Sequence, residues 1–339
     1  MGCIKIDKKA LFHNLDLICS RAGGSHRVAA VLKDNAYGHG LEVIAPLISD
    51  FGIKKAVVRN LQEAERIERF FEYILVLADI PKKTSKFSFA INSIESIESF
   101  PKGCFVELKV DTGMHRSGIS PLEVERAVEK IVKRGLILKG VFTHFRSADE
   151  ISPEFFWQKR NFDETIKKVE SLRQEFSLPD ILYHSYNSSA LFRSENLQGD
   201  FARVGIAVYG YLELDPLFGE PDLKPVLSLW ASRISSRTLK PKERVGYGGV
   251  FEAKGGETVS TYDIGYADGI FRSDGKRRLL LPEGVEIAGR ISMDSFSALS
   301  DAEEICVIKD AREFARFFGT ISYEVLVKLS PFLKRRVVQ

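Results

Sequence analysis

A single lysine, Lys33, stands where an apolar run gives way to residues typical of a loop. The run covers residues 28–32, and Asn35, Tyr37 and two glycines follow the lysine closely. This pattern predicts a buried strand that delivers Lys33 to a strand-to-loop junction. A desolvated amine there suits Schiff-base chemistry, and the Tyr37 phenol could bind a cofactor phosphate. A strand-end lysine that reaches back to water is the alternative.

Two further cations belong to a second loop. Lys109 lies near the end of the apolar stretch 104–110, and Arg116 follows between Gly113 and Gly118. A loop in this position could direct the Arg116 guanidinium at a carboxylate, although a solvated loop arginine fits the same pattern. Lys109 lies within a predicted strand and therefore needs an acidic partner or a modification.

Polar residues also occur at the ends of three later apolar segments. They are His144, the pair Asn187-Ser188, and Arg203 with Gly205 and Ile206. A serine at a helix start and a glycine after a strand offer a hydroxyl and backbone N–H groups to a phosphate. Arg203 requires a buried acceptor. A structural histidine, a helix cap and a tight turn are the alternatives, and no metal site is expected around His144 because no second His or Cys has the right spacing.

Two glycine-rich turns later in the chain contain Tyr266 and Met293. A tyrosine between such turns is exposed enough to act as a general acid or base if its phenol has a lowered pKa. A turn tyrosine that packs on its neighbours is the alternative.

Eight apolar segments, each followed by a helical pattern or a loop, position most of these residues. They cover residues 28–32, 55–58, 73–78, 87–91, 104–110, 136–145, 182–186 and 202–209. Helical spacing is present between them, for example over 93–100, 121–134 and 153–176. Continuous apolar strands alternating with helices over roughly two hundred residues favour an α/β fold, a (β/α)8 TIM-like barrel. We expect this barrel domain over residues 8–222.

From residue 223 onward the pattern indicates a mostly β C-terminal domain that extends to residue 339. Short strands are predicted over 226–237, 257–263, 278–281, 285–288 and 304–309, and helices over 311–318 and 321–328. Gly, Asp, Pro and Lys turns separate the strands. The short strand within residues 1–7 is expected to associate with this domain.

The composition excludes several classes of partner. The chain has 339 residues, 44% of them hydrophobic, and a net charge of +3. The basic run near the C-terminus, Lys334-Arg335-Arg336, is interpreted as a solvated end, and neither nucleic acid nor a membrane is an expected partner. The N-terminus lacks a signal-peptide core and the four cysteines show no paired spacing, which predicts a cytoplasmic protein.

Taken together, five stretches resemble the motifs of the alanine racemase family, which are fold-type III pyridoxal 5'-phosphate (PLP) enzymes. The stretches are Lys33-Asp-Asn-Ala-Tyr-Gly-His-Gly, Lys109-Val-Asp-Thr-Gly-Met-His-Arg, Arg203-Val-Gly-Ile-Ala-Val-Tyr-Gly, Ile264-Gly-Tyr-Ala-Asp-Gly and Gly289-Arg-Ile-Ser-Met-Asp. They occur in the family's order, and the resemblance extends from about Ile4 to Lys328.

The resemblance implies a PLP-dependent, two-base interconversion of L- and D-alanine that supplies D-alanine for peptidoglycan. Lys33 would bind PLP covalently and act as the base on one face of the substrate. Tyr266, from the other subunit of a homodimer, would be the base on the opposite face. Active sites would then be shared between subunits.

Further roles follow from the same resemblance. His144 would hydrogen-bond Tyr266, and Arg203 would face the pyridine nitrogen. The residues implied in cofactor binding are Lys33, Tyr37, His144, Asn187, Ser188, Arg203, Gly205, Ile206 and Tyr323. Arg116 and the Met293 backbone would hold the substrate carboxylate. Lys109, carbamylated in many family members, would orient Arg116.

The chain departs from the family pattern at three positions. Ser292 stands where a cysteine is frequent, His115 where a glycine is frequent, and Tyr186 where a small residue is usual. The last two could alter the pocket rim and the substrate breadth. The alternatives are a broader amino-acid racemase, a fold-type III decarboxylase, and a non-catalytic PLP-homeostasis protein. Arg203 argues against the decarboxylases, which place a carboxylate at the pyridine nitrogen, and the second domain argues against the homeostasis protein.

Overall fold

The computed structural model describes residues 2–274 and 277–339. The chain divides into two compact units. One comprises residues up to Leu11, Asn35–Val43 and Lys224–Gln339, and the other comprises Phe12–Asp34 and Ile44–Leu223. Among the described residues, no helix is both long and apolar enough to cross a membrane.

The larger unit is built on eight parallel strands. They are β2 (Val28–Val31), β3 (Lys55–Val58), β4 (Tyr73–Val76), β5 (Ser88–Ile91), β6 (Phe105–Lys109), β7 (Ile137–Phe142), β8 (Leu182–His184) and β9 (Ala202–Val204). Their order is β8-β7-β6-β5-β4-β3-β2-β9. Two backbone bonds join the ends of this row, from Asp200 N–H to Tyr183 O (2.8 Å) and from Arg203 N–H to Tyr186 O (2.9 Å). The predicted barrel is confirmed.

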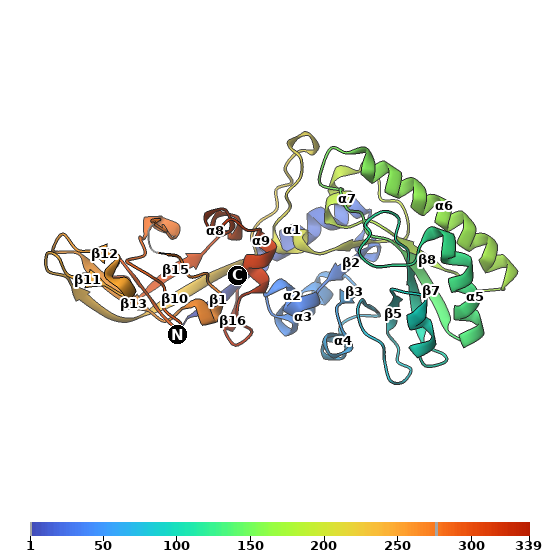
Figure 1. Cartoon of the computed structure of the whole chain (residues 1–339), viewed down its shortest axis with the longest axis horizontal. Coiled ribbons are helices and arrows are strands. Elements are labelled where there is room, and N and C mark those ends of the chain that lie inside the picture. Colours follow the sequence, from blue (N-terminus) through green and yellow to red (C-terminus); the bar gives the residue numbers. More distant parts are fainter. Residues whose placement is uncertain (1, 275–276) are drawn as a thin grey trace. The chain divides into compact units, whose positions relative to one another are not determined.

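Helices cover the outside of these strands. They are α1 (Lys8–Ala22), α3 (Leu41–Phe51), α4 (Leu61–Ile67), α5 (Val124–Arg134), α6 (Pro153–Glu175) and α7 (Ser188–Arg193). Figure 1 shows α5 and α6 along the outer side of β7 and β8. Helix α5 buries Val124, Ala127, Val128 and Ile131, which share one face of a helix with 3.6 residues per turn.

Two predicted elements of the barrel differ from the structure. The helix expected over 93–100 is a short 3₁₀ segment, Glu95–Ser99, which ends just before Pro101. The strand expected over 202–209 stops at Val204, and Ile206–Tyr209 form a 3₁₀ turn. Here Gly205 donates its N–H to the Ser188 hydroxyl instead of to a strand.

The other unit contains a mixed sheet with the order β14-β13-β10-β1-β16, in which β15 also pairs with β10. Its strands are β1 (Cys3–Asp7), β10 (Leu227–Thr238), β13 (Thr258–Tyr262), β14 (Phe296–Ala298), β15 (Glu304–Ile308) and β16 (Lys334–Val338), and β11 (Arg244–Val245) pairs with β12 (Phe251–Glu252). Helices α8 (Ala311–Phe318) and α9 (Ser322–Val327) follow β15. The predicted mostly β character is confirmed. The strands predicted over 278–281 and 285–288 are wrong, since isolated bridges such as Leu280 with Glu286 take their place.

The basic run near the C-terminus is not a solvated end, so that interpretation is wrong. Lys334–Val338 form β16, which pairs in parallel with β1 and places Arg335 opposite Ile4. Lys334 and Arg336 are exposed, whereas Arg335 is half-buried. Strand pairing sends alternate side chains to opposite faces, which separates Arg335 from its two basic neighbours.

Candidate active site

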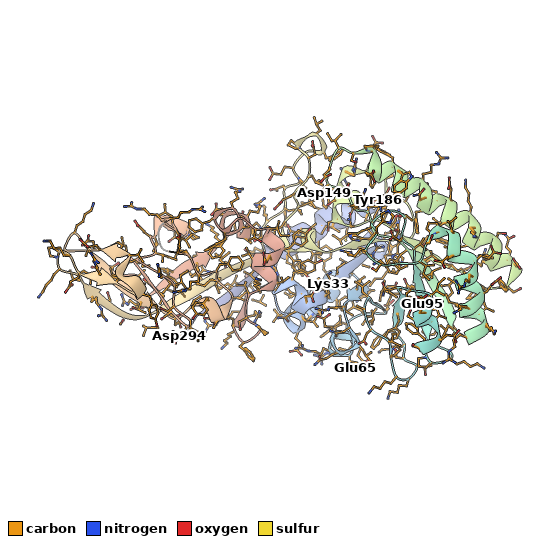
Figure 2. All side chains as sticks on the ribbon, in the orientation of Figure 1. Lys33, Glu65, Glu95, Asp149, Tyr186 and Asp294 are labelled. Carbon is orange, nitrogen blue, oxygen red and sulfur yellow. The ribbon has the colours of Figure 1, made fainter. Side chains whose placement is uncertain are left out.

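The turn that carries Lys33 has an unusual backbone. Helix α2 (Lys33–Tyr37) begins directly beyond β2, as predicted for a strand-to-loop junction, and Figure 2 labels Lys33 there. Asp34, Asn35, Ala36 and Tyr37 have φ values of 54°, 58°, 54° and 51°, so the turn is left-handed. This conformation costs about 1–2 kcal/mol for each residue with a side chain. Surrounding interactions must therefore hold it.

Hydrogen bonds within the following residues hold this turn. The Asn35 side chain accepts from Leu41 N–H at 2.8 Å, and its carbonyl accepts from Gly40 N–H at 3.0 Å. The buried His39 bonds through Nδ1 to the carbonyls of Tyr37 (3.0 Å) and Ala36 (3.1 Å). Because a carbonyl only accepts, Nδ1 carries the proton. Burial lowers the His39 pKa to about 3, so this imidazole is neutral.

Four cations gather at the carboxyl ends of the barrel strands. Burial, and then Arg116, Arg203 and Lys33, lower the pKa of Lys109 to about 8, although Asp111 opposes the shift. Burial and the same cations, with Lys109, lower the pKa of His144 to about 3. His144 is therefore neutral near pH 7. The cluster thus brings together Lys33, Lys109, Arg116 and Arg203 around His144, as expected for a site that receives anionic groups.

Arg203 is held inside the barrel by neutral acceptors. Its Nη1 donates to His184 Nδ1 (2.6 Å) and to the His184 carbonyl (2.8 Å), and its Nη2 donates to the Thr143 carbonyl (2.5 Å). The predicted buried acceptor is confirmed. Burial lowers the Arg203 pKa to about 10, which leaves the guanidinium charged at neutral pH.

A buried carboxylate balances that charge through His184. Glu107 Oε2 lies 2.8 Å from His184 Nε2, and Glu107 Oε1 accepts from the Tyr73 hydroxyl at 2.5 Å. A guanidinium only donates, so His184 must accept at Nδ1 and donate from Nε2. Burial lowers the His184 pKa to about 4 and raises the Tyr73 pKa well above its usual value, so both residues stay neutral.

This network predicts a large effect for Glu107→Gln. The amide NH2 would face either Tyr73 or His184, both of which donate to the carboxylate, and Arg203 would lose its compensating charge. We expect the free energy of unfolding to fall by about 3 kcal/mol. Urea denaturation measures it, with Glu129→Gln on the exposed face of α5 as the matched control. Equal stability of the two variants would show that Glu107 does not compensate Arg203.

The start of α7 and the turn after β9 form a cradle in which the Ser188 hydroxyl meets the Gly205 N–H. Asn187 caps α7, since its side chain accepts from Ala190 N–H at 2.9 Å. The buried Ser188 hydroxyl accepts from Gly205 N–H at 3.2 Å, and Ile206 begins the next 3₁₀ turn. Asn187 is therefore the residue that caps this helix, as the alternative interpretation of the Asn187-Ser188 pair predicted. Ser188, Gly205 and Ile206 come together where a phosphate could bind.

The loop that carries Arg116 folds back along β6. Asp111 N–H donates to Ile119 O (2.9 Å), and Ile119 N–H donates to Lys109 O (2.8 Å). The Lys109 amine donates to the Ser117 hydroxyl at 2.5 Å. Arg116 itself is exposed. Lys109 thus reaches the residue next to Arg116, which suits the orienting role that the resemblance implies.

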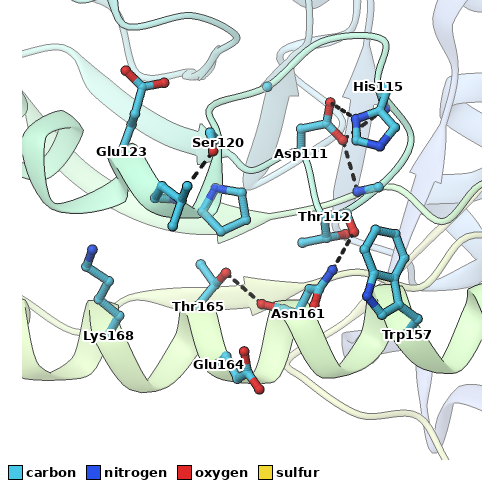
Figure 3. Close-up of a pocket in the computed structure, with 14 residues that line it drawn as sticks. Asp111, Thr112, His115, Ser120, Glu123, Trp157, Asn161, Glu164, Thr165 and Lys168 are labelled. Carbon is cyan, nitrogen blue, oxygen red and sulfur yellow. Dashed lines mark hydrogen bonds and ion pairs between the residues drawn. The ribbon is translucent and has the colours of Figure 1, made fainter.

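A cleft of about 710 Å³ lies between this loop and α6. Figure 3 shows Trp157 and Asn161 of α6 facing Asp111, Thr112 and His115. The Asn161 amide donates to the Thr112 carbonyl at 3.0 Å and so ties the loop to the helix. None of the four clustered cations Lys33, Lys109, Arg116 and Arg203 is among the described residues that line this cleft.

In the other unit, the turns of Tyr266 and Met293 lie against each other. Tyr266 N–H donates to Ser292 O (3.1 Å), and Ala267 N–H donates to Met293 O (2.8 Å). A Cβ on Gly265 would lie only 2.2 Å from Met293 O, so the approach requires glycine. Tyr266 and Met293 are 40% and 60% exposed, which leaves both available to a ligand.

The same unit brings together the two tyrosines expected at the phosphate. The rings of Tyr37 and Tyr323 are 6.1 Å apart at an interplanar angle of 49°. Tyr37 is buried, whereas Tyr323 is 40% exposed. Residues 37 and 323 are thus neighbours despite their separation along the chain.

Comparison with known proteins identifies the family of this chain. Residues 6–213 match the family model "Alanine racemase, N-terminal domain", and residues 226–337 match "Alanine racemase, C-terminal domain". The chain belongs to the alanine racemase family. It is therefore an enzyme of the isomerase class, an amino-acid racemase.

Individual members of the family cover nearly the whole chain. The alanine racemase of a Nitratiruptor species is 51% identical over 99% of both chains. That of Campylobacter concisus is 45% identical over 100% of both. The solved alanine racemase of Clostridium difficile 630 superposes with a TM-score of 0.89 at 25% identity, over 99% of this chain and 95% of that one.

The site fits PLP, the cofactor that the family implies. Lys33 and the Ser188–Gly205 cradle follow the carboxyl ends of barrel strands, and Arg203 lies within β9 just before Gly205. The cluster is cationic and suits a phosphate. Arg203 is charged near pH 7, and its partners at His184 and Thr143 are neutral acceptors. An unprotonated pyridine nitrogen is also a neutral acceptor, so it matches the kind of partner that Arg203 has here.

Two of the departures from the alanine racemase family have a local explanation. His115 has φ +55°, which glycine adopts more easily, and Asp111 accepts its N–H at 3.0 Å. Ser292 accepts the Tyr266 N–H through its backbone carbonyl, so a change of side chain leaves that bond intact.

The third departure, Tyr186, does not lie at a rim. It is 1% exposed, and its ring packs edge-on against Phe145 at 6.1 Å (labelled in Figure 2). The expectation that Tyr186 alters a pocket rim is therefore wrong, because the side chain is buried against Phe145.

Sequence reasoning missed Tyr73, Glu107 and His184. One signal was present, since Glu107 stands two residues before Lys109 inside an apolar strand and so shares its face. A glutamate there requires buried donors. The sequence could not say that β4 and β8 supply them.

Proposed function

We propose that this chain interconverts L- and D-alanine with PLP, and that Lys33 and Tyr266 are the bases on opposite faces of the substrate. The observation that carries the proposal is the cluster of Lys33, Arg116 and Arg203 at the barrel strand ends, in a chain of this family. Racemisation needs one group to remove the α-proton from one face of Cα and another group to return a proton to the opposite face. A single lysine cannot do both.

Each residue has a distinct task in this scheme. The Arg116 guanidinium binds the substrate carboxylate and fixes the Cα–H bond between the bases. The Lys33 amine accepts or returns the proton on one face, and the Tyr266 phenol does so on the other. His144, neutral because of its lowered pKa, can hydrogen-bond the phenol without adding charge.

The cofactor contacts are proposed on the same basis. Bound PLP supplies an electron sink that acidifies the Cα–H bond. Its phosphate would bind Ser188, Gly205 and Ile206, with Asn187, Tyr37 and Tyr323 nearby in the family's arrangement. Arg203 would donate to the pyridine nitrogen and, being permanently charged near pH 7, keep that nitrogen unprotonated.

A chiral assay tests this function. The purified enzyme, supplied with PLP, is offered L-alanine, D-alanine, serine, lysine and ornithine separately, and both enantiomers and amines are quantified. We expect racemisation of alanine without amine products. Faster racemisation of another amino acid would favour the broader racemase. Amine products would favour the decarboxylase. Bound PLP without any turnover would favour the homeostasis protein.

Lys109 is expected to be carbamylated at neutral pH. The reaction needs a neutral amine, and a fall in pKa from 10.5 to about 8 raises the neutral fraction near pH 7.5 by roughly a hundredfold or more. In ¹³C-bicarbonate, NMR should show one carbamate carbon that grows as the pH rises through 8. Lys109→Met should abolish it, whereas Lys139→Met, at an exposed position of β7, should not. A signal that survives Lys109→Met would place the carbamate elsewhere.

The proposed setting is a cytoplasmic homodimer that supplies D-alanine for peptidoglycan. The exposure of Tyr266 and Met293 supports shared sites, since both could act on a second copy of the chain. Sedimentation equilibrium of the PLP-loaded enzyme tests the dimer, and a monomer with full activity would contradict it.

A further inference from the structure

One short segment, Tyr323–Arg335, contacts both turns to which the proposed bases belong. It contains most of α9, the start of β16 and the loop between them. All of these contacts lie within the unit formed by Asn35–Val43 and Lys224–Gln339.

The first contact is with the turn that follows Lys33. A Cβ on Gly38 would lie 2.0 Å from Leu326 O, so the two backbones touch. Gly38 also has φ +80°, a conformation that favours glycine. The Tyr37 ring meets the Tyr323 ring one turn earlier in α9. The end of the left-handed turn is thus packed on α9.

The second contact is with the turn that follows Tyr266. A Cβ on Gly269, at φ +102°, would lie 2.2 Å from Lys328 O and 2.7 Å from Leu329 Cα. Ser330 N–H donates to Asp268 O at 3.0 Å. Asp268 in turn accepts from Gly265 N–H at 2.9 Å and closes the Tyr266 turn.

Arg335 joins the two contacts. Its Nη2 donates to Gly38 O (2.8 Å) and to Ser330 O (3.1 Å), and its Nη1 donates to Leu333 O (2.5 Å) and Pro331 O (3.0 Å). One half-buried guanidinium therefore fixes the loop that holds Asp268 and also the carbonyl that ends the Lys33 turn. Lysine, with a single ammonium, could not reproduce this fork.

We propose that Tyr323–Arg335 is a brace that positions together the Tyr266 turn and residues Tyr37 and Gly38, which end the Lys33 turn, with Arg335 as its positioning residue. This inference rests on the proposed function. In a dimer with shared sites, Lys33 and Tyr266 of one chain serve different active sites, so the brace links one site to the other. A change in the Tyr266 turn should therefore alter the affinity for PLP.

Arg335→Met tests the brace, and Arg336→Met, an exposed arginine in the same strand, is the matched control. The loss of a charged donor to Gly38 should weaken PLP binding to the apoenzyme about tenfold and lower kcat in both directions by a similar factor. Arg336→Met should match the wild type. Arg335→Lys should recover part of the loss, because it keeps the charge and a donor nitrogen but lacks the fork of the guanidinium.

Gly269→Ala tests the link between the turns without altering Arg335. Gly256→Ala is its control, since Gly256 has a similar φ of +89° and no atom within 4 Å of an added Cβ. The brace requires weaker PLP binding in Gly269→Ala than in Gly256→Ala, although residue 269 belongs to the Tyr266 turn. This comparison decides the matter even if Arg335→Met fails to fold.

Two results would overturn the brace. One is PLP affinity and kcat in Arg335→Met equal to those of Arg336→Met. The other is a Gly269→Ala enzyme with reduced kcat but the PLP affinity of Gly256→Ala. Failure of the proposed function is recognised separately, as absence of alanine racemisation by the wild type, whereas PLP affinities can be measured in either case.

Discussion

Tyr266→Phe is expected to lower kcat for alanine racemisation by about 10²–10⁴-fold while PLP binding stays unchanged. Phenylalanine keeps the ring and removes the hydroxyl that would carry a proton to one face of Cα. Lys33 remains intact, so in D2O one enantiomer should still exchange its α-proton without inversion. Rates in both directions and ¹H NMR of that exchange measure the effect.

The control for this variant is Tyr247→Phe, an exposed tyrosine in the same unit as Tyr266. It should racemise alanine like the wild type. Full activity of Tyr266→Phe in both directions would refute the two-base assignment. Exchange of both enantiomers without inversion would do the same, because it would show that a remaining base reaches both faces.

Lys33→Ala is expected to abolish covalent capture of PLP and to reduce kcat by at least about 10³-fold. The amine would serve both as the attachment point and as one of the two bases, so its removal affects two functions. Borohydride reduction followed by peptide mass spectrometry should place PLP on Lys33 in the wild type. Lys83→Ala, an exposed lysine of the barrel unit, is the control. PLP trapped on another lysine would contradict the assignment.

Mixing these two inactive variants tests whether the sites are shared. A heterodimer of Lys33→Ala and Tyr266→Phe would contain one site with both bases and one with neither. Random reassociation should therefore restore about a quarter of the wild-type rate. No restoration, with heterodimers demonstrated by mass, would mean that Lys33 and Tyr266 act within one chain.

Most of the barrel was predictable from the sequence. Most strands are short, largely apolar runs, and helices such as α5 have a periodic apolar face, and these patterns arise between residues close in sequence. The errors fall where tertiary contacts override the local pattern. Gly205 bonds to Ser188 and ends β9 early, and Arg335 lies in a paired strand instead of a free tail.

The sequence by itself determined the fold class, the family and the residues proposed for the chemistry, because these depend on residue type and spacing. Only the tertiary structure showed the left-handed backbone from Asp34 to Tyr37. It alone joined Glu107 to Arg203 through His184, and the Lys33 and Tyr266 turns through Tyr323–Arg335. Buried charges need partners and strained turns need supports, and the fold draws both from strands and helices far apart in the chain.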